Sequence, residues 1–173
     1  MLYFAYGSNM SLRRLRARVP SAQRFKVATL HAHRLAFHKI GTDGSAKCDI
    51  SPCTHGQASV FGVLYTMAAR HRAALDRAEG LGNGYEVKQL DVVALDGERV
   101  SAFSYYATAV DDTLQPFDWY LRHVLHGARE NALPADYTAR IAAIAAVRDP
   151  DPVRARRELA IHTSTDDVRG TLP

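Results

Sequence analysis

The sequence contains no run of about 18 apolar residues, the length that a membrane-spanning helix requires. Its start also lacks the basic segment, the long apolar segment and the small-residue cleavage site of a secretory signal. These absences argue against an integral membrane protein and against a secreted one. We therefore expect a cytoplasmic location and no membrane partner.

Cysteine is scarce, with only Cys48 and Cys53 among 173 residues. Their spacing in KCDISPC closes too small a loop for a confident disulfide and matches no common zinc spacing. We expect two thiols that are not joined, as is usual in the cytoplasm. The eight histidines also show no metal-ligand spacing, so we expect no metal site.

The sequence also lacks a nucleophile elbow and a Walker loop. The glycine-rich stretch GLGNG at 80–84 follows an expected helix and precedes an expected strand, which is the reverse of a Rossmann turn. The regular alternation of strands and helices that a doubly wound nucleotide-binding fold needs is absent as well. These features argue against nucleotide-dependent chemistry.

The formal charge of +4 is modest, but basic residues cluster near the start of the chain. They are Arg13, Arg14, Arg16, Arg18, Arg24 and Lys26. Such a cluster can bind nucleic acid or another anion. However, Leu12, Leu15 and Val19 recur at helical spacing, and no aromatic residues interleave the charges. We therefore favour a solvated helix face and expect no nucleic-acid partner.

The remaining sequence has the composition of a globular protein, with 47% hydrophobic and 23% charged residues. Strand patterns come first and helix patterns last, with one helix inserted, and Asp96-Gly97 predicts a hairpin. We expect strands at 2–6, 25–30, 34–40, 57–67, 85–95 and 98–108, and helices at 11–18, 68–80, 116–132 and 134–147.

This order predicts an α+β fold, with a curved, largely antiparallel sheet that closes towards a small barrel and helices that flank it. The segment 41–56 is rich in Gly, Ser, Asp, Thr and Pro, so we expect a loop there. No repeat or composition break divides the chain. We expect a single domain over 1–173, whose tail from about 148 holds one short helix and is peripheral.

Two features can carry chemistry. The first strand ends in Tyr6-Gly7-Ser8-Asn9, a turn that can present bare N–H groups to a carboxylate or a polarised carbonyl. Taken alone, it is also what an ordinary tight turn uses. Glu79 ends a helix, where the helix dipole disfavours the charged carboxylate and so suits a group that exchanges protons. The alternative is a solvated surface glutamate.

These features in this order resemble the gamma-glutamylcyclotransferase family. The resemblance rests on FAYGSNM at 4–10, LDRAEG at 75–80, SYY at 104–106 and YLRHVLHGARENALPADYTARIAAI at 120–144. The stretch GARENALPADY resembles the branch that acts on γ-glutamyl amino acids more than the glutathione-specific branch. The resemblance implies a mixed barrel whose cavity holds the γ-glutamyl group of a small-molecule substrate, in a monomer or homodimer.

The resemblance also implies roles for individual residues. Glu79 corresponds to the catalytic acid/base. The substrate-binding loop corresponds to Tyr6, Gly7, Ser8, Asn9 and Met10, and the pocket tyrosines correspond to Tyr85, Tyr105 or its neighbour Tyr106, and Tyr120.

The implied reaction closes the α-amine of a γ-glutamyl compound onto its γ-carbonyl, which releases 5-oxoproline and an amino acid or amine without a cofactor. A runner-up is the same reaction on a γ-glutamylamine or a γ-glutamylated biosynthetic intermediate. An alternative of another class is a protein of this fold that binds small metabolites without catalysis, although a binding-only pocket has no need of Glu79.

Overall fold

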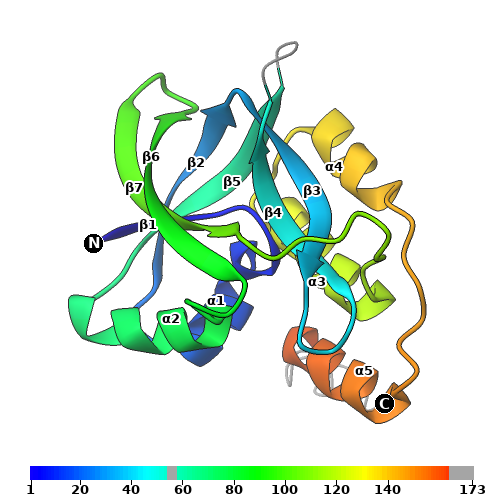
Figure 1. Cartoon of the computed structure of the whole chain (residues 1–173). Helices are drawn as coiled ribbons and strands as arrows, with labels where there is room; N and C mark the ends of the chain where they lie inside the picture. The colour runs from blue at the N-terminus through cyan, green and yellow to red at the C-terminus, as the bar shows by residue number, and fades with distance from the viewer. Residues whose placement is uncertain (54–57, 164–173) are drawn as a thin grey trace, which may run out of the picture.

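The structure, a computed structural model, describes residues 1–53 and 58–163. Five strands form a closed barrel in the order β1-β5-β2-β6-β7, and β1 closes it by pairing parallel with β7 while the other neighbours pair antiparallel. Their bounds are β1 (Leu2–Ala5), β5 (Ser59–Thr66), β2 (Gln23–His31), β6 (Tyr85–Ala94) and β7 (Arg99–Ala107). The predicted α+β fold with a small, mostly antiparallel barrel is confirmed (Figure 1).

The strands form where apolar and β-branched residues predict them. The β6–β7 hairpin turns at Asp96-Gly97, and Gly97 has a φ of 87°, a left-handed conformation that glycine adopts without strain. Among the barrel residues, Phe4, Val63 and Leu64 are fully buried. The barrel therefore has a packed core, and a ligand has to bind at its end or its side.

The prediction of a loop over 41–56 is wrong for its central part. Ala46–Pro52 forms β4, which pairs antiparallel with β3 (His33–Ile40) in a separate two-stranded sheet. The alternating residues Ala46, Cys48 and Ile50 are buried, but two of the three are small and polar residues separate them, so the strand pattern is weak. Residues 54–56 of the expected loop lie outside the described residues.

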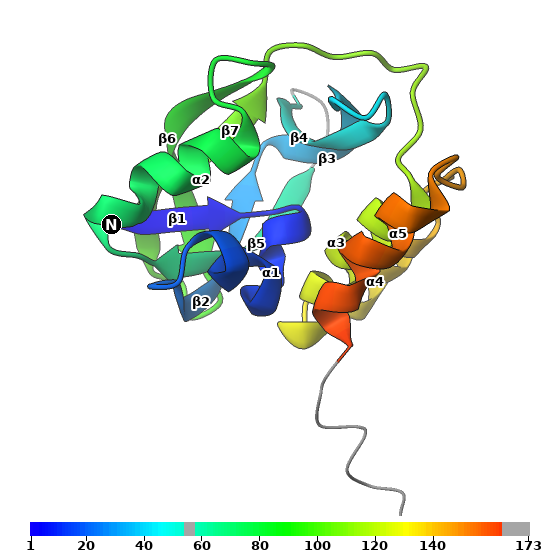
Figure 2. The same cartoon turned by 90° about the horizontal axis from the view of Figure 1, so that it is seen from below.

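Five α-helices accompany the strands in the described part of the chain. They are α1 (Leu12–Arg18), α2 (Arg72–Glu79), α3 (Asp118–Glu130), α4 (Ala135–Ala142) and α5 (Pro152–Leu159). Figure 2 shows α3, α4 and α5 gathered on one flank of the barrel, with α5 packed against α3. Helix α2 ends at Gly80, whose φ is 73°, as the sequence predicts.

The basic cluster near the start does not form a wholly solvated helix face, so that interpretation is wrong for two of its residues. Arg14 is buried and pairs with Glu158 of α5 at 3.1 Å, and Arg18 pairs with Glu79 of α2 at 3.1 Å. Because these partners lie far away in the sequence, helical spacing alone gives no sign of them.

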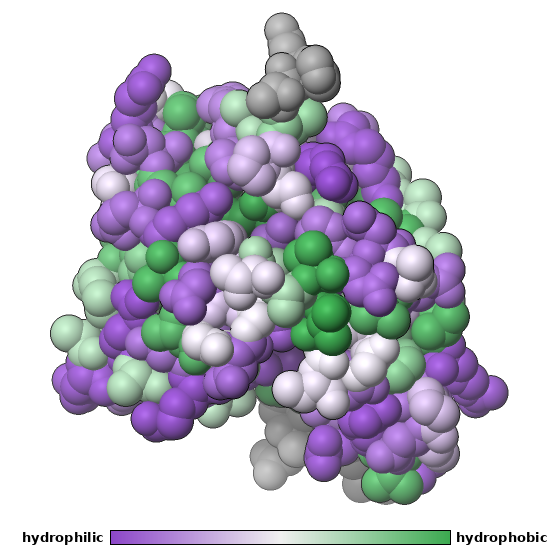
Figure 3. All heavy atoms as spheres, in the orientation of Figure 1, coloured by the Kyte–Doolittle hydropathy of each residue, from purple (hydrophilic) through white to green (hydrophobic). Residues whose placement is uncertain are grey.

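The surface in the view of Figure 3 is mostly hydrophilic, with hydrophobic residues in small separate groups. None of the described helices is both long and apolar enough to cross a membrane. Cys48 and Cys53 are not joined in a disulfide, which confirms that prediction. Of the expected peripheral tail, residues 164–173 lie outside the described residues.

Candidate active site

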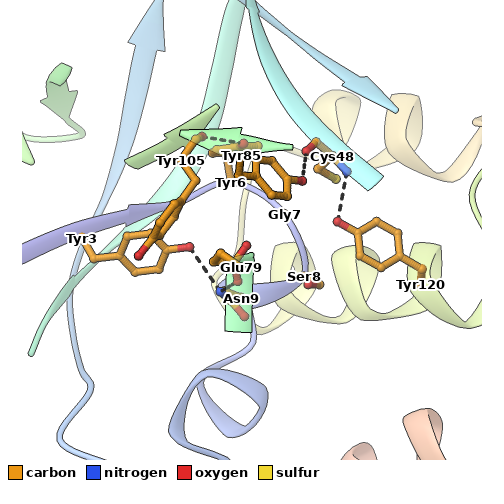
Figure 4. Close-up of a pocket in the computed structure, with 10 residues that line it drawn as sticks. All are labelled: Tyr3, Tyr6, Gly7, Ser8, Asn9, Cys48, Glu79, Tyr85, Tyr105 and Tyr120. Atoms are coloured by element: carbon orange, nitrogen blue, oxygen red, sulfur yellow. Dashed lines mark hydrogen bonds between the residues drawn. The ribbon is translucent and has the colours of Figure 1, made fainter. Parts of the chain in front are cut away.

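A small cavity lies where the first strand ends, between the barrel, β4 and α3 (Figure 4). Ten residues from six segments of the chain line it. They are Tyr3, Tyr6, Gly7, Ser8, Asn9, Cys48, Glu79, Tyr85, Tyr105 and Tyr120. Eight of the nine predicted site residues are therefore brought together, although they are spread over more than a hundred positions of the sequence.

The turn after β1 approaches β4 closely at Gly7. A Cβ atom at this position would lie 3.0 Å from Cys48 Cβ and 3.5 Å from the Tyr120 hydroxyl, so a side chain would push the two segments apart. A short 3₁₀ turn, Ser8–Met10, follows. Within residues 1–53 and 58–163, the N–H groups of Gly7 and Ser8 donate to no acceptor. They remain able to bind a ligand oxygen.

Met10 is the one predicted site residue that does not line the cavity. Its N–H donates to the Gly7 carbonyl at 3.0 Å, and its carbonyl accepts from Tyr65 and Asn131. Its side chain is fully buried in the core, and α3 approaches it so closely at Gly127 that a Cβ there would lie 2.6 Å from Met10 Cβ. Met10 anchors the turn to α3.

Glu79 ends α2 and turns its carboxylate into the cavity, where its side chain is 17% exposed. Its Oε1 accepts from Asn9 Nδ2 at 2.7 Å and from Arg18 Nη1 at 3.1 Å. Arg18 also donates to Asn9 Oδ1 at 3.0 Å, which closes a ring of three side chains. In the described structure Oε2 has no hydrogen-bond partner, so this oxygen can accept a proton. The alternative of a solvated surface glutamate does not fit this environment.

Four tyrosines, which we call the tyrosine wall, surround the turn. They are Tyr6, Tyr85, Tyr105 and Tyr120. The Tyr120 hydroxyl accepts from the Cys48 N–H at 3.0 Å, and the Tyr85 hydroxyl donates to the Cys48 carbonyl. These two hydroxyls thus fix β4 against the cavity, as the dashed lines in Figure 4 show.

The other two wall residues connect β7 with the turn and with α2. Tyr6 donates to the Tyr105 carbonyl at 2.7 Å, and Tyr105 donates to Asp76 Oδ1 at 2.5 Å. Because Asp76 lies one turn before Glu79 on α2, this bond helps to set the position of the Glu79 carboxylate. Tyr105 rather than Tyr106 lines the cavity; the Tyr106 ring instead lies under the Lys88 ammonium at 5.0 Å.

Burial keeps the hydroxyls and the thiol of the cavity neutral. It raises the pKa of Tyr6, Tyr85 and Tyr120 well above that of a free tyrosine, and it raises the pKa of Cys48 to about 12. Cys48 is therefore a poor nucleophile. Among the described residues no group of three histidines, cysteines or carboxylates is arranged to hold a metal ion.

Sequence reasoning missed two of the lining residues. Tyr3 accepts from Asn9 Nδ2 at 3.2 Å and stacks on Phe103. Tyr3 was missed because it lies within the first strand, before the turn that the sequence singles out. Cys48 was missed because its strand was expected to be a loop.

A wider cleft of about 260 Å³ adjoins the cavity and shares Ser8, Glu79, Tyr85 and Tyr120 with it. We call it the basic cleft because five cationic side chains line it. They are Arg14, Arg18, Lys39, Lys47 and Arg77. The glycine-rich loop after α2 and the turn before β4 also contribute to it, through residues 80, 83, 41 and 42.

Several known proteins are similar to this chain in sequence or in structure. The AIG2-like family matches residues 59–141. A solved structure titled gamma-glutamyl cyclotransferase superposes with a TM-score of 0.83 at 27% identity and covers 92% of this chain and 98% of its own. A yeast glutathione-specific enzyme superposes with a TM-score of 0.60 at 12% identity, which shows a shared fold alone.

Curated relatives cover most of the chain. Human gamma-glutamylcyclotransferase is 33% identical over 153 residues, which cover 83% of this chain and 78% of the human protein. The bovine enzyme is 31% identical with the same coverage. The similarity therefore extends over most of the chain in both sequence and fold. The chain is a member of the gamma-glutamylcyclotransferase family.

Proposed function

We propose that this gamma-glutamylcyclotransferase releases 5-oxoproline from γ-glutamyl amino acids or amines in the small cavity, with Glu79 as the group that moves protons. The α-amine of the substrate attacks its own γ-carbonyl, a five-membered lactam closes, and the amine on the other side leaves. The observation that supports this role is the Glu79 carboxylate, which is held through Oε1 while Oε2 faces the cavity without a partner in the described structure.

The ring formed by Glu79, Asn9 and Arg18 explains how one carboxylate can both accept and return a proton. Asn9 and Arg18 fix Oε1 and with it the plane of the group, so that Oε2 can take a proton from the α-ammonium and return it to the leaving nitrogen. The tyrosine wall excludes water from the inner side. A bent substrate held in this way gains on the order of 7 kcal/mol from intramolecular geometry.

The bare N–H groups of Gly7 and Ser8 supply the second requirement, which is to bind substrate oxygens. Fixed N–H donors in a cavity with little water stabilise a developing oxyanion without having to reorganise. The same groups are equally suited to the α-carboxylate of the substrate. Whether the N–H groups bind the oxyanion or the α-carboxylate, residues 6–9 bind the substrate and Glu79 carries out the proton transfers.

The decisive experiment measures 5-oxoproline directly after incubation with γ-glutamyl dipeptides, γ-glutamylamines and glutathione. We expect product from at least one γ-glutamyl compound. We also expect that Glu79→Gln lowers kcat by roughly 10²- to 10⁴-fold, the usual contribution of acid–base catalysis. The exposed Glu86, changed to Gln, is the matched control. Near-normal turnover in a folded Glu79→Gln protein would remove Glu79 from the mechanism.

A further inference from the structure

The basic cleft meets the cavity at Glu79, next to the leaving nitrogen of the proposed reaction. Tyr3, Tyr6 and Tyr105 line the cavity but not the cleft, whereas Ser8, Glu79, Tyr85 and Tyr120 line both. Since Glu79 returns its proton to the leaving nitrogen, the groups attached to that nitrogen extend into the cleft. The chemistry of the cleft therefore bears on which leaving groups the enzyme accepts.

Most cations of the cleft already have a carboxylate partner. Arg14 pairs with Glu158 at 3.1 Å, Arg18 with Glu79 at 3.1 Å, and Lys47 with Asp43 at 2.7 Å. Arg77 is exposed to solvent on α2. These four charges are thus either neutralised within the protein or hydrated.

Lys39 differs from all of them. The residue is only 5% exposed, and its ammonium forms no ion pair or hydrogen bond with any described residue. Glu79 and Asp43 attract it from beyond ion-pair distance, and burial lowers the pKa of Lys39 despite them. Since this ammonium lines the open cleft and no carboxylate of the described residues pairs with it, the position can bind an anion that comes from outside the protein.

The backbone is shaped to put Lys39 in this place. The pairing of β3 with β4 shifts register between Phe37 and Lys39, a β-bulge of the kind that redirects a side chain next to an active site. Gly84 makes room, since a Cβ there would lie 3.1 Å from Lys39 Cε and 3.3 Å from Nζ. The ammonium then lies over the Tyr85 ring, 4.7 Å from its centroid.

From this arrangement we propose that Lys39 is a specificity-determining residue whose ammonium binds a carboxylate on the leaving group. The inference rests on the proposed function and deepens it, because it assigns the enzyme a preference for γ-glutamyl compounds with an anionic leaving group. Neutral γ-glutamylamines lack that group and forgo the interaction. The carboxylate of the product amino acid provides an anionic partner for this ammonium.

The test compares γ-glutamylalanine with γ-glutamylalaninamide, which differ only in the carboxylate of the leaving group. For the parent enzyme we expect a higher kcat/KM with γ-glutamylalanine. In Lys39→Met we expect kcat/KM for γ-glutamylalanine to fall about 10- to 100-fold, the loss typical of a charge-assisted hydrogen bond, with little change for the alaninamide. Lys39→Arg keeps the charge and should retain part of the preference.

Lys88→Met is the matched control, because the Lys88 ammonium also lies over a tyrosine ring, at 5.0 Å, but does not line the basic cleft. We expect it to keep the substrate preference of the parent enzyme. An equal loss on both substrates in Lys39→Met would overturn the inference, since Lys39 would then act on Glu79 rather than on the leaving group. A Lys39→Met enzyme that keeps the parent preference for γ-glutamylalanine over γ-glutamylalaninamide would overturn the inference as well. No 5-oxoproline from either substrate in the parent enzyme would refute the proposed function itself and the inference with it.

Discussion

The two sides of the site are held together by different forces. In the tyrosine wall, three of the four hydroxyls bond to backbone groups, and burial keeps all four neutral. In the basic cleft, ion pairs join segments that are distant in the sequence, such as Arg14 of α1 with Glu158 of α5. The inner side is a neutral scaffold, and the outer side is a network of charges.

This difference separates the residues that hold the site together from the residues that bind the substrate. Because the wall hydroxyls are already hydrogen-bonded to β4, β7 and α2, their main contribution is to hold those elements in place. The groups left for the substrate include the N–H groups of Gly7 and Ser8, Oε2 of Glu79 and the ammonium of Lys39. The site therefore combines a few groups that are free for a ligand with a larger set that fixes their positions.

Gly7→Ala tests the inner side most severely. The new Cβ would lie 3.0 Å from Cys48 Cβ, so the turn or β4 has to move by a few tenths of an ångström or more. Displaced donors lose alignment with the substrate, and we expect kcat/KM to fall on the order of 10²-fold. Steady-state assays with the best γ-glutamyl substrate measure this effect.

Gly82→Ala is the control for this substitution. Gly82 has a φ of 79°, so alanine costs backbone strain there, but nothing lies within 4 Å of the new Cβ. We expect lower stability with kcat/KM close to that of the parent enzyme. Equal losses of activity in the two variants would mean that strain, rather than the approach of Gly7 to β4, sets the rate.

Tyr120→Phe tests whether the wall hydroxyls serve architecture. The change leaves the buried Cys48 N–H without an acceptor, and we expect the free energy of unfolding to fall by about 1–3 kcal/mol. Chemical denaturation measures it. Tyr106→Phe, whose hydroxyl has no hydrogen bond in the described structure, should change stability little. A Tyr120→Phe protein of unchanged stability that has lost activity would instead assign the hydroxyl to the substrate.

The barrel and the inner site could largely be predicted from the sequence. Local signals marked them: the hairpin at Asp96-Gly97, the glycine after Glu79 and the apolar strand before Gly7. The strand over 46–52 was missed because small and polar residues hide its alternation. Its place beside the cavity depends on two hydroxyl bonds to the Cys48 backbone, whose partners are 37 and 72 residues away.

The outer side could not be predicted in the same way. Arg14 and Lys39 have ordinary sequence surroundings, and neither helical spacing nor strand period indicates that they are buried. Arg14 turns inward because of Glu158, which lies 144 residues further along the chain. Lys39 turns inward because of a bulge and the space at Gly84. Such features arise from packing between distant segments, which a single sequence does not display.

The smallest expected effect concerns the pH response of the outer side. His123 accepts from Arg14 at Nε2, which leaves its Nδ1–H to donate to His162 Nε2 at 2.6 Å. This chain of bonds holds the 3₁₀ turn after α5 only while His162 is neutral. Burial, together with the nearby His126, His123 and Arg14, lowers the pKa of His162 from 6.5 to about 4.

As pH falls below 6.5, the unfolded chain takes up the His162 proton before the folded protein does, so the free energy of unfolding decreases between pH 6.5 and about 4. From pH 4.5 downwards Glu158, whose pKa is lowered to about 2 by the neighbouring His123 and Arg14, adds a further loss. The tyrosine wall does not titrate under these conditions. We expect thermal melts between pH 7 and 4 to show a smaller loss of Tm in His162→Gln than in the parent protein. His31 is an exposed histidine, so His31→Gln serves as the control and should match the parent. Identical slopes in all three proteins would show that the charge network of the outer side is not sensitive to this proton.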